Sequence, residues 1–121
     1  MKSTQLLSNL QFREAGPNAD PLYVDQYGRA ILFTLKPGQS IKGHEVPNSP
    51  FYVVVLKGHG LFSGAEGKER RFGPNDLLIF EPGEEHLVRA AEEELVFVGF
   101  LHGAPSNTSE KIGGEIGHAK K

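Results

Sequence analysis

The sequence predicts an all-β protein, with antiparallel strands arranged as a sandwich or barrel. Fifteen glycines and eight prolines divide the 121 residues into short apolar runs. These runs are four to seven residues long, are rich in Val, Ile, Phe and Tyr, and are separated by turn sequences at near-regular spacing, which is the pattern of antiparallel strands. No window of a dozen residues keeps an apolar helical period without a Gly or Pro inside it, so helices are disfavoured.

Seven strands are predicted, each of them an apolar run that ends at a turn sequence such as PGQ, KGHG, FGPND or EPGEE. In chain order they are Leu22–Tyr27, Arg29–Leu35, Phe51–Leu56, Gly60–Ser63, Leu77–Phe80, His86–Ala90 and Leu95–Leu101. Before them, Ser3–Ala15 is expected to form a short helix or an arm. The domain plan is therefore an N-terminal arm at 1–20, one barrel at 21–103 and a flexible C-terminal tail at 104–121, because the tail has only two isoleucines as large apolar residues.

The strand that begins at Phe51 is apolar on both faces. Residue alternation places Phe51, Val53 and Val55 on one face, and a second apolar set on the other. A strand of this kind is buried on both sides. The outer side then meets a second sheet, a terminal segment or another subunit, and we predict a homodimer.

Composition excludes several classes of partner and site. Thirteen Lys and Arg against 15 Asp and Glu give a formal charge of −2, and no basic stretch is longer than two residues, so neither nucleic acid nor an anionic membrane is an expected partner. The absence of cysteine removes disulfides, thiolate nucleophiles and Cys-type zinc sites. No signal-peptide pattern or membrane-length apolar run is present, so we expect a cytoplasmic protein.

Two motifs, in the order Gly38…His44…Gly58 and Asp76…Gly83…His86, resemble those of the cupin family. The first family motif is Gly, five residues, His-x-His, three or four residues, Glu, six residues, Gly. The second is Gly-Asp, a short apolar strand, Pro-x-Gly, two residues, His, three residues, Asn. The resemblance covers residues 28–103 and implies a double-stranded β-helix, or jelly-roll, barrel.

In the cupin family, three residues of the first motif and the histidine of the second hold one divalent metal. The resemblance places these four ligand positions at His44, Val46, Phe51 and His86, so two of them keep a donor atom. Two imidazoles alone should bind Fe, Mn, Ni, Zn or Cu only weakly. His102, on the last predicted strand, is the first candidate for a third ligand.

The alternative to a metal site is a pocket that has none. In that interpretation His44 and His86 line the pocket and hydrogen-bond to a ligand or to water, while His102 is a strand-end histidine near solvent. Val46, Phe51 and Val53 are predicted to be pocket-lining wall residues. A phenylalanine in place of a glutamate makes the floor apolar, which favours an aromatic or alkyl group over a sugar phosphate.

Two functions from different classes follow. The first is a binding module that holds a small, partly apolar molecule in the barrel. The second is a metal-dependent enzyme, dioxygenase-like or isomerase-like, with His44, His86 and His102 as ligands. A metal-free isomerase with a histidine base ranks last, because it needs a carboxylate or tyrosine across the pocket. The sequence identifies neither ligand nor reaction, since this fold hosts many functions.

Overall fold

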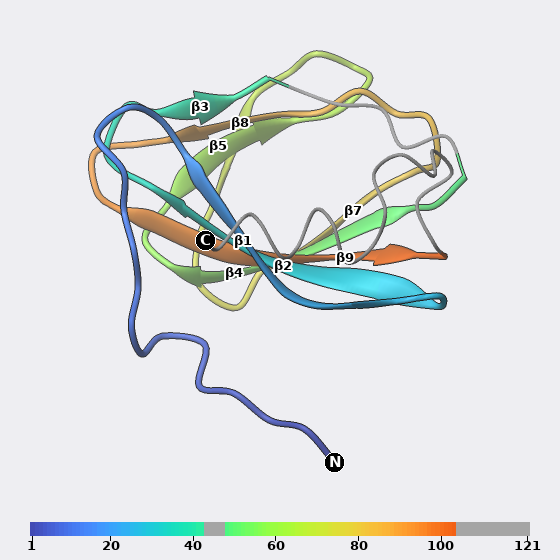
Figure 1. The fold of residues 1–121 in the computed structure, drawn as a ribbon. Helices are drawn as coiled ribbons and strands as arrows, with labels where there is room; N and C mark the ends of the chain where they lie inside the picture. Colours follow the sequence, from blue (N-terminus) through green and yellow to red (C-terminus); the bar gives the residue numbers. More distant parts are fainter. Residues whose placement is uncertain (43–47, 104–121) are drawn as a thin grey trace.

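The computed structural model describes residues 1–42 and 48–103, and within these ranges it contains nine strands and no helix (Figure 1). The strands are β1 (Asn18–Asp25), β2 (Gly28–Leu35), β3 (Ser40–Ile41), β4 (Phe51–Lys57), β5 (Gly60–Ser63), β6 (Arg70–Phe72), β7 (Leu77–Phe80), β8 (Leu87–Ala90) and β9 (Leu95–His102). The described residues therefore include no helix that is long and apolar enough to cross a membrane.

The strands form two facing sheets (Figure 1). The larger sheet has the order β1-β2-β9-β4-β7 and the smaller has the order β3-β8-β5-β6, with all neighbouring strands antiparallel. Strands that are distant in sequence lie side by side, as β2 and β9 do, which is the topology of a jelly roll. The predicted all-β barrel is confirmed.

All seven predicted strands are present, two with the predicted ends and five with shifted ends, and two further strands were not predicted. The first strand begins at Asn18 rather than Leu22, across the expected boundary between arm and barrel. The additional strands are β3, which has two residues, and β6, which reads Arg-Arg-Phe. Neither strand contains an apolar run. β3 is instead identified by its backbone pairing with β8, and β6 by its pairing with β5. The Ser3–Ala15 segment forms an arm without helix.

The inner face of the larger sheet carries the main core. On β9 the residues that face inward are Leu95, Phe97, Gly99 and Leu101, and on β4 they are Phe51, Val53 and Val55. Phenylalanine rings run through this core. The Phe33 and Phe97 rings stack with centroids 4.7 Å apart, and the Phe62 ring meets Phe97 edge-on at 5.6 Å. The interior is thus filled by aromatic packing, which contributes beyond simple burial.

Gly99 allows one of these rings to lie against β9. A Cβ atom added at Gly99 would stand 2.5 Å from Cε1 and 2.7 Å from Cζ of Phe51. Side chains do not approach this closely in well-packed cores, so the missing side chain of Gly99 makes the space that the Phe51 ring fills.

Opposite this core, the arm covers part of the outer face of the larger sheet. A second cluster there consists of Leu32, Val96 and Val98, with Leu10, Phe12, Leu22, Val54 and Leu56 packed against it. The arm is held by polar contacts as well, since Thr34 Oγ1 donates to the Gln11 carbonyl at 2.5 Å and Gln39 Nε2 donates to the Arg13 carbonyl at 2.8 Å. β4 is therefore buried on its inner face, as expected, but its outer residues Tyr52, Val54 and Leu56 are only partly buried, and the arm supplies part of their cover.

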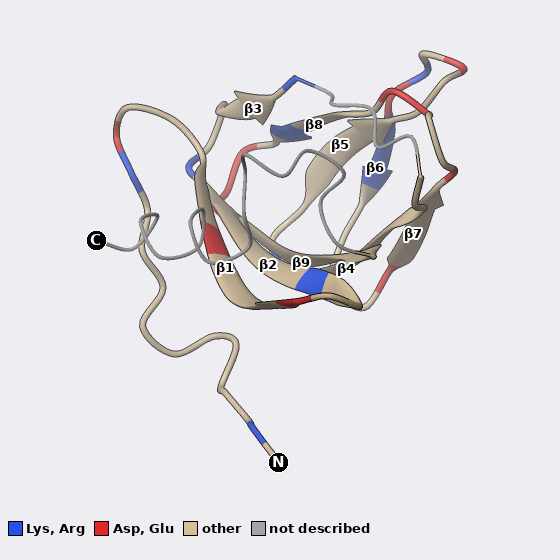
Figure 2. Ribbon diagram, turned by 45° about the vertical axis from the view of Figure 1, so that its right-hand side comes forward, with Lys and Arg blue, Asp and Glu red and all other residues tan. Residues whose placement is uncertain are grey.

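Charged residues are distributed unevenly over the strands. Figure 2 shows charged residues in the turns and on several strands, whereas β9, at the centre of the larger sheet, carries no Lys, Arg, Asp or Glu.

The glycines of the two sequence motifs are required by the local backbone conformation. Gly38, Gly58 and Gly83 all have positive φ, and a Cβ atom at Gly58 would stand 1.9 Å from the carbonyl oxygen of Glu94. Only glycine fits such a position without strain.

Candidate functional site

Four strands of the larger sheet begin or end together at one end of the barrel, which we call the mouth. β2 begins there at Gly28 and β4 begins at Phe51, while β7 ends at Phe80 and β9 ends at His102. The last inward-facing residues before this end are paired directly across the strands. We call them the mouth row, and they are Arg29, Leu101, Phe51 and Phe80.

His86 lies against the mouth row, immediately before β8. Its side chain is 5% exposed. Its ring centroid is 5.0 Å from that of Phe51 and 4.8 Å from that of Phe80, and its Nδ1 atom is 3.4 Å from the Glu84 carbonyl oxygen. A buried imidazole between two phenylalanine rings presents apolar ring faces and polar ring nitrogens at one place.

Glu84 fixes the turn that carries His86. Its carboxylate accepts hydrogen bonds from the backbone N–H groups of Ala65, at 2.8 Å, and Glu81, at 2.7 Å. These two bonds hold the pKa of the Glu84 carboxyl below its usual range. The carboxylate therefore ties the β5–β6 turn to the turn in front of His86.

Arg29 is a mouth residue that sequence reasoning missed. It lies on β2 in phase with Ile31, Phe33 and Leu35, which all contribute to the inner core. Its Nε atom is buried and has no hydrogen-bond partner within the described part of the chain. A buried N–H without an acceptor costs about 1–3 kcal/mol. Strand alternation on β2 was the signal that could have identified it.

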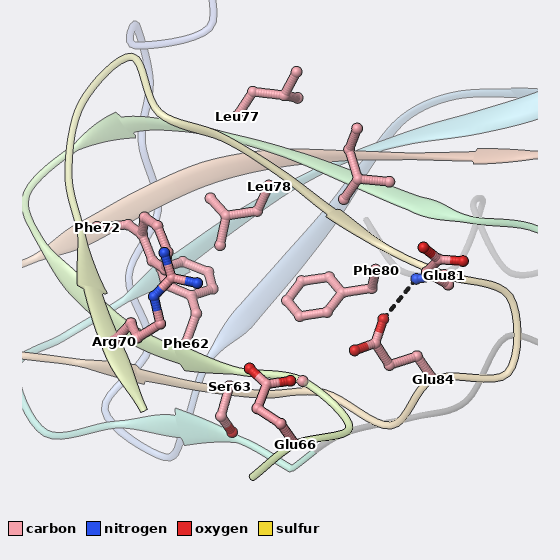
Figure 3. A pocket seen from close by; sticks show the side chains of 12 residues that line it. Phe62, Ser63, Glu66, Arg70, Phe72, Leu77, Leu78, Phe80, Glu81 and Glu84 are labelled. Atoms are coloured by element: carbon pink, nitrogen blue, oxygen red, sulfur yellow. Dashed lines mark hydrogen bonds between the residues drawn. The ribbon is translucent and has the colours of Figure 1, made fainter. Parts of the chain in front are cut away.

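A separate hollow of about 390 Å³ lies between the β5–β6 hairpin and β7 (Figure 3). We call it the edge cavity. Its lining combines apolar and charged side chains. Figure 3 shows Leu78 and Phe80 pointing into it and Leu77 pointing away, and the Arg70 guanidinium lies 5.1 Å from the Phe72 ring centroid. The apolar part of the lining includes Phe62, Phe72, Leu78 and Phe80, and the charged part includes Glu66, Arg70, Glu81 and Glu84.

His102 lies on the other face of the larger sheet from His86. The residues next to it on β9, Leu101 inward and Phe100 outward, fix this orientation by alternation. The His102 Nε2 atom is 3.1 Å from the Tyr52 hydroxyl, and the two rings meet edge-on. The structure therefore does not bring His102 and His86 together.

The predicted ligand set is only partly within the described chain. His44 and Val46 lie outside the described residues, while Val53 is fully buried one row below Phe51. Of the four ligand positions, the described ones hold a phenyl ring at Phe51 and one imidazole at His86. Within residues 1–42 and 48–103, no three His, Cys, Asp or Glu side chains gather as a metal site. A single imidazole beside a phenyl ring does not fit a divalent metal.

Comparison with known proteins identifies relatives of this barrel. The family model described as "Cupin domain" matches residues 31–100. A Klebsiella pneumoniae protein with a double-stranded β-helix domain superposes with a TM-score of 0.81 at 17% identity, covering 88% of this chain and 94% of that one. No curated protein matches the chain.

Two further solved structures are similar. A Thermus thermophilus protein superposes with a TM-score of 0.80 at 19% identity, covering 87% of this chain and 100% of that one. An RmlC-like cupin from Desulfovibrio desulfuricans gives a TM-score of 0.75 at 25% identity, with coverages of 84% and 96%. The matched lengths are similar, so the described barrel corresponds to nearly the whole of these proteins.

Proposed function

The chain belongs to the cupin family, and we propose that it binds a small, partly apolar molecule at the mouth of its barrel. The observation that carries the proposal is His86, a polar ring buried against Phe51 and Phe80 where the strands end. Small-molecule sites combine apolar walls with a few placed polar groups. His86 supplies the polar group of the site, and the two phenyl rings supply the wall.

Phe51 supports an apolar ligand in particular. It occupies the position at which the first cupin motif has a metal-binding glutamate. Its ring packs against those of Phe33 and Phe80, with centroid distances of 6.2 Å in both cases. The mouth row is therefore apolar from Leu101 to Phe80. An aromatic or alkyl group loses little by contact with such a row and gains from leaving water.

An NMR fragment screen with the isotope-labelled full chain tests the proposal. We expect aromatic and alkyl fragments to shift backbone amide signals around Phe51 and His86. A His86→Gln variant, which keeps a polar side chain without the ring, should weaken those fragments. Arg70→Met, in the edge cavity, is the matched control and should leave them unchanged. Fragments that shift neither Phe51 nor His86 would refute the mouth as the site.

The edge cavity is the second candidate site, and its volume is the observation in its favour. About 390 Å³ falls within the usual range for small-molecule pockets. Phe80 lines this cavity and also contacts His86, so the two places share one side chain. In the same screen, fragments that shift signals around Arg70 and Phe72 and are weakened by Arg70→Met would assign binding here.

Metal analysis separates the binding module from the metal-dependent enzyme. Under our proposal, protein purified without an affinity tag contains no stoichiometric Fe, Mn, Ni, Zn or Cu, because only His86 among the described ligand positions has a donor atom. Stoichiometric metal that disappears in a His44→Ala variant would contradict the metal-free interpretation and support a site shared by His44 and His86.

We also propose that two copies associate through the uncovered part of the outer face. One paired row there crosses all five strands and contains no charge, and it consists of Tyr23, Ala30, Phe100, Tyr52 and Ile79. Ile79 is 54% exposed and Phe100 is 40% exposed. Contiguous exposed apolar surface of this kind is typical of subunit interfaces, and an uncharged row can meet its own copy without repulsion.

Light scattering measures this association. We expect a mass near twice 13.2 kDa at micromolar concentration, and a return to the single-chain mass in Phe100→Asp. The matched control is Leu87→Asp, since Leu87 is also 40% exposed but lies on the smaller sheet. A single-chain mass for the unmodified protein would refute the dimer.

A further inference from the structure

We propose that Arg29 binds a carboxylate group of the mouth ligand, so that the ligand class is a small acid with an apolar body. This inference rests on the proposed function, because it assigns a second polar contact in the same site. It uses a residue for which neither motif provides a role. The argument depends on the position of Arg29, on its unpaired Nε atom and on the charges around it.

Arg29 and His86 are within reach of one small molecule. Arg29 belongs to the mouth row, and Leu101 separates it from Phe51, against which His86 packs. Adjacent strands lie roughly 4.8 Å apart, so the backbones at Arg29 and Phe51 are about 10 Å apart. An arginine side chain and a short acid together span such a distance. A ligand whose apolar body rests on Phe51 therefore places its other end near the guanidinium group.

The Nε atom of Arg29 is a donor that no described residue uses. It is buried and, within the described residues, has no acceptor. Buried donors in folded proteins are almost always paired, so we infer that a bound ligand supplies the acceptor. Nε–H and one terminal N–H of arginine form a fork that matches the two oxygens of a carboxylate.

The neighbours of Arg29 in the described chain do not compete for this fork. Its paired residues on either side are Val24 and Leu101, which carry no charge. Asp25, the nearest acid along the chain, is used by the β1–β2 turn, because its Oδ1 accepts from the backbone N–H groups of Tyr27, at 2.8 Å, and Gly28, at 3.1 Å. The carboxylate of Asp25 therefore supports the turn instead of pairing with Arg29.

The charge of the mouth row selects a monoanion. Arg29 is the only charged member of the row, and Leu101, Phe51 and Phe80 are apolar. A phosphate dianion is usually held by several donors and cations, whereas one guanidinium matches one carboxylate in both charge and geometry. A short aromatic or alkyl carboxylic acid can thus place its carboxylate at Arg29 and its apolar body against the apolar residues of the row.

Acetate tests the anion contact without relying on the apolar contact. The side-chain Nε–Hε NMR signal of Arg29 is assigned by its loss in an Arg29→Lys variant. We expect acetate to shift this signal in the full chain, and the side-chain signal of Arg70 to stay in place. Acetate that leaves the Arg29 signal unchanged, or shifts both signals alike, would overturn the inference.

Two matched probes then test the complete ligand. We expect 3-phenylpropanoate to bind about tenfold or more tightly than its neutral amide, 3-phenylpropanamide. Arg29→Met should remove this difference by weakening only the acid, and Arg70→Met should preserve it. Equal binding of acid and amide to the unmodified protein would overturn the role of Arg29.

The two failures are distinguishable. If the amide shifts signals at His86 while acetate has no effect on Arg29, the carboxylate inference is wrong and the proposed function stands. If acetate shifts Arg29 while neither phenyl probe reaches His86, the anion contact stands and the apolar binding function is wrong. If no probe acts at either residue, both are wrong. Should Arg29→Met fail to fold, the acetate shift and the Arg29→Lys variant still decide the question.

Discussion

The two faces of the larger sheet are built from the same strands but differ in what covers them. On β9, Phe97 faces inward and is 1% exposed, whereas Phe100 faces outward and is 40% exposed. The inner face is packed against the smaller sheet, and the outer face is covered only in part, by the arm. Residue type alone therefore does not predict how much a side chain contributes to stability, because strand alternation decides whether it faces the smaller sheet or the partly covered outer face.

The same contrast separates the histidines. His86 is buried against the mouth row, and His102 lies on the outer face beside Tyr52. Polar groups on the inner side of the barrel, His86 and Arg29, are placed where water is scarce and where a ligand gains most from a polar contact. Polar groups on the outer side, such as His102, can replace a protein hydrogen bond by one to water with little loss of free energy. Site chemistry is therefore expected at the mouth of the inner face.

The largest difference between the faces should appear on truncating matched phenylalanines of β9. Phe97→Ala removes a ring that packs against Phe33 and Phe62 and should lower the free energy of unfolding by about 3–5 kcal/mol. Phe100→Ala removes a partly exposed ring and should lower the free energy of unfolding by about 1 kcal/mol or less. Urea unfolding at low protein concentration measures both. Equal losses would show that the two faces do not differ as described.

A smaller effect is expected from filling the space at Gly99. Gly99→Ala places a Cβ atom where the Phe51 ring lies and should cost about 1–3 kcal/mol through overpacking. The double variant Gly99→Ala/Phe51→Leu should cost less than the sum of the two single variants, because the smaller side chain relieves the contact. Additive losses in urea unfolding would mean that Gly99 does not make room for Phe51.

Acid titration compares a carboxylate at the mouth with one on the arm. Because the pKa of Glu84 is lowered by the backbone N–H groups of Ala65 and Glu81, its ionised form stabilises the fold above the usual carboxyl pKa, and this stabilisation is lost as the pH falls through the lowered value. Glu84→Gln should therefore lower the free energy of unfolding at neutral pH, by about 1 kcal/mol, and flatten its decrease in acid.

Glu14 is the matched control for that titration. Its pKa is also lowered, by Lys36, but the group is fully exposed and water screens the pair. Glu14→Gln should change the free energy of unfolding less than Glu84→Gln does, and added salt should reduce the difference further. A flat acid limb in Glu14→Gln and an unchanged one in Glu84→Gln would reverse the assignment.

The barrel could be predicted from sequence because its signals are local. Turn glycines such as Gly58 and Gly83 need positive φ, and the apolar runs between them set the strands. Alternation alone predicted the buried inner face of β4, but it overstated the outer face, which is only partly buried. The strands β3 and β6 could not be predicted in this way, because two residues in one case and an Arg-Arg pair in the other contain no apolar signal.

The site was less predictable because it depends on which strands become neighbours. His86 was identified from motif spacing, but its contact with Phe80 depends on the pairing of β4 with β7. Arg29 is brought to the mouth row by the pairing of β2 with β9, which joins the two ends of the barrel sequence. His102 was assigned to the pocket from its strand, although alternation after Leu101 points to the other face.

The smallest effect is expected where His102 meets Tyr52. Tyr52→Phe removes one exposed hydrogen bond, to His102 Nε2 at 3.1 Å, and should lower the free energy of unfolding by about 0.5 kcal/mol. His102→Ala should leave metal content and fragment binding as they are in the unmodified protein. For His102 to join His86, β9 would have to shift by one residue, which would turn Leu101 outward and Phe100 into the core. That exchange would disrupt the inner packing, so a loss of bound metal in His102→Ala, with the fold intact, would contradict the separation of the two faces.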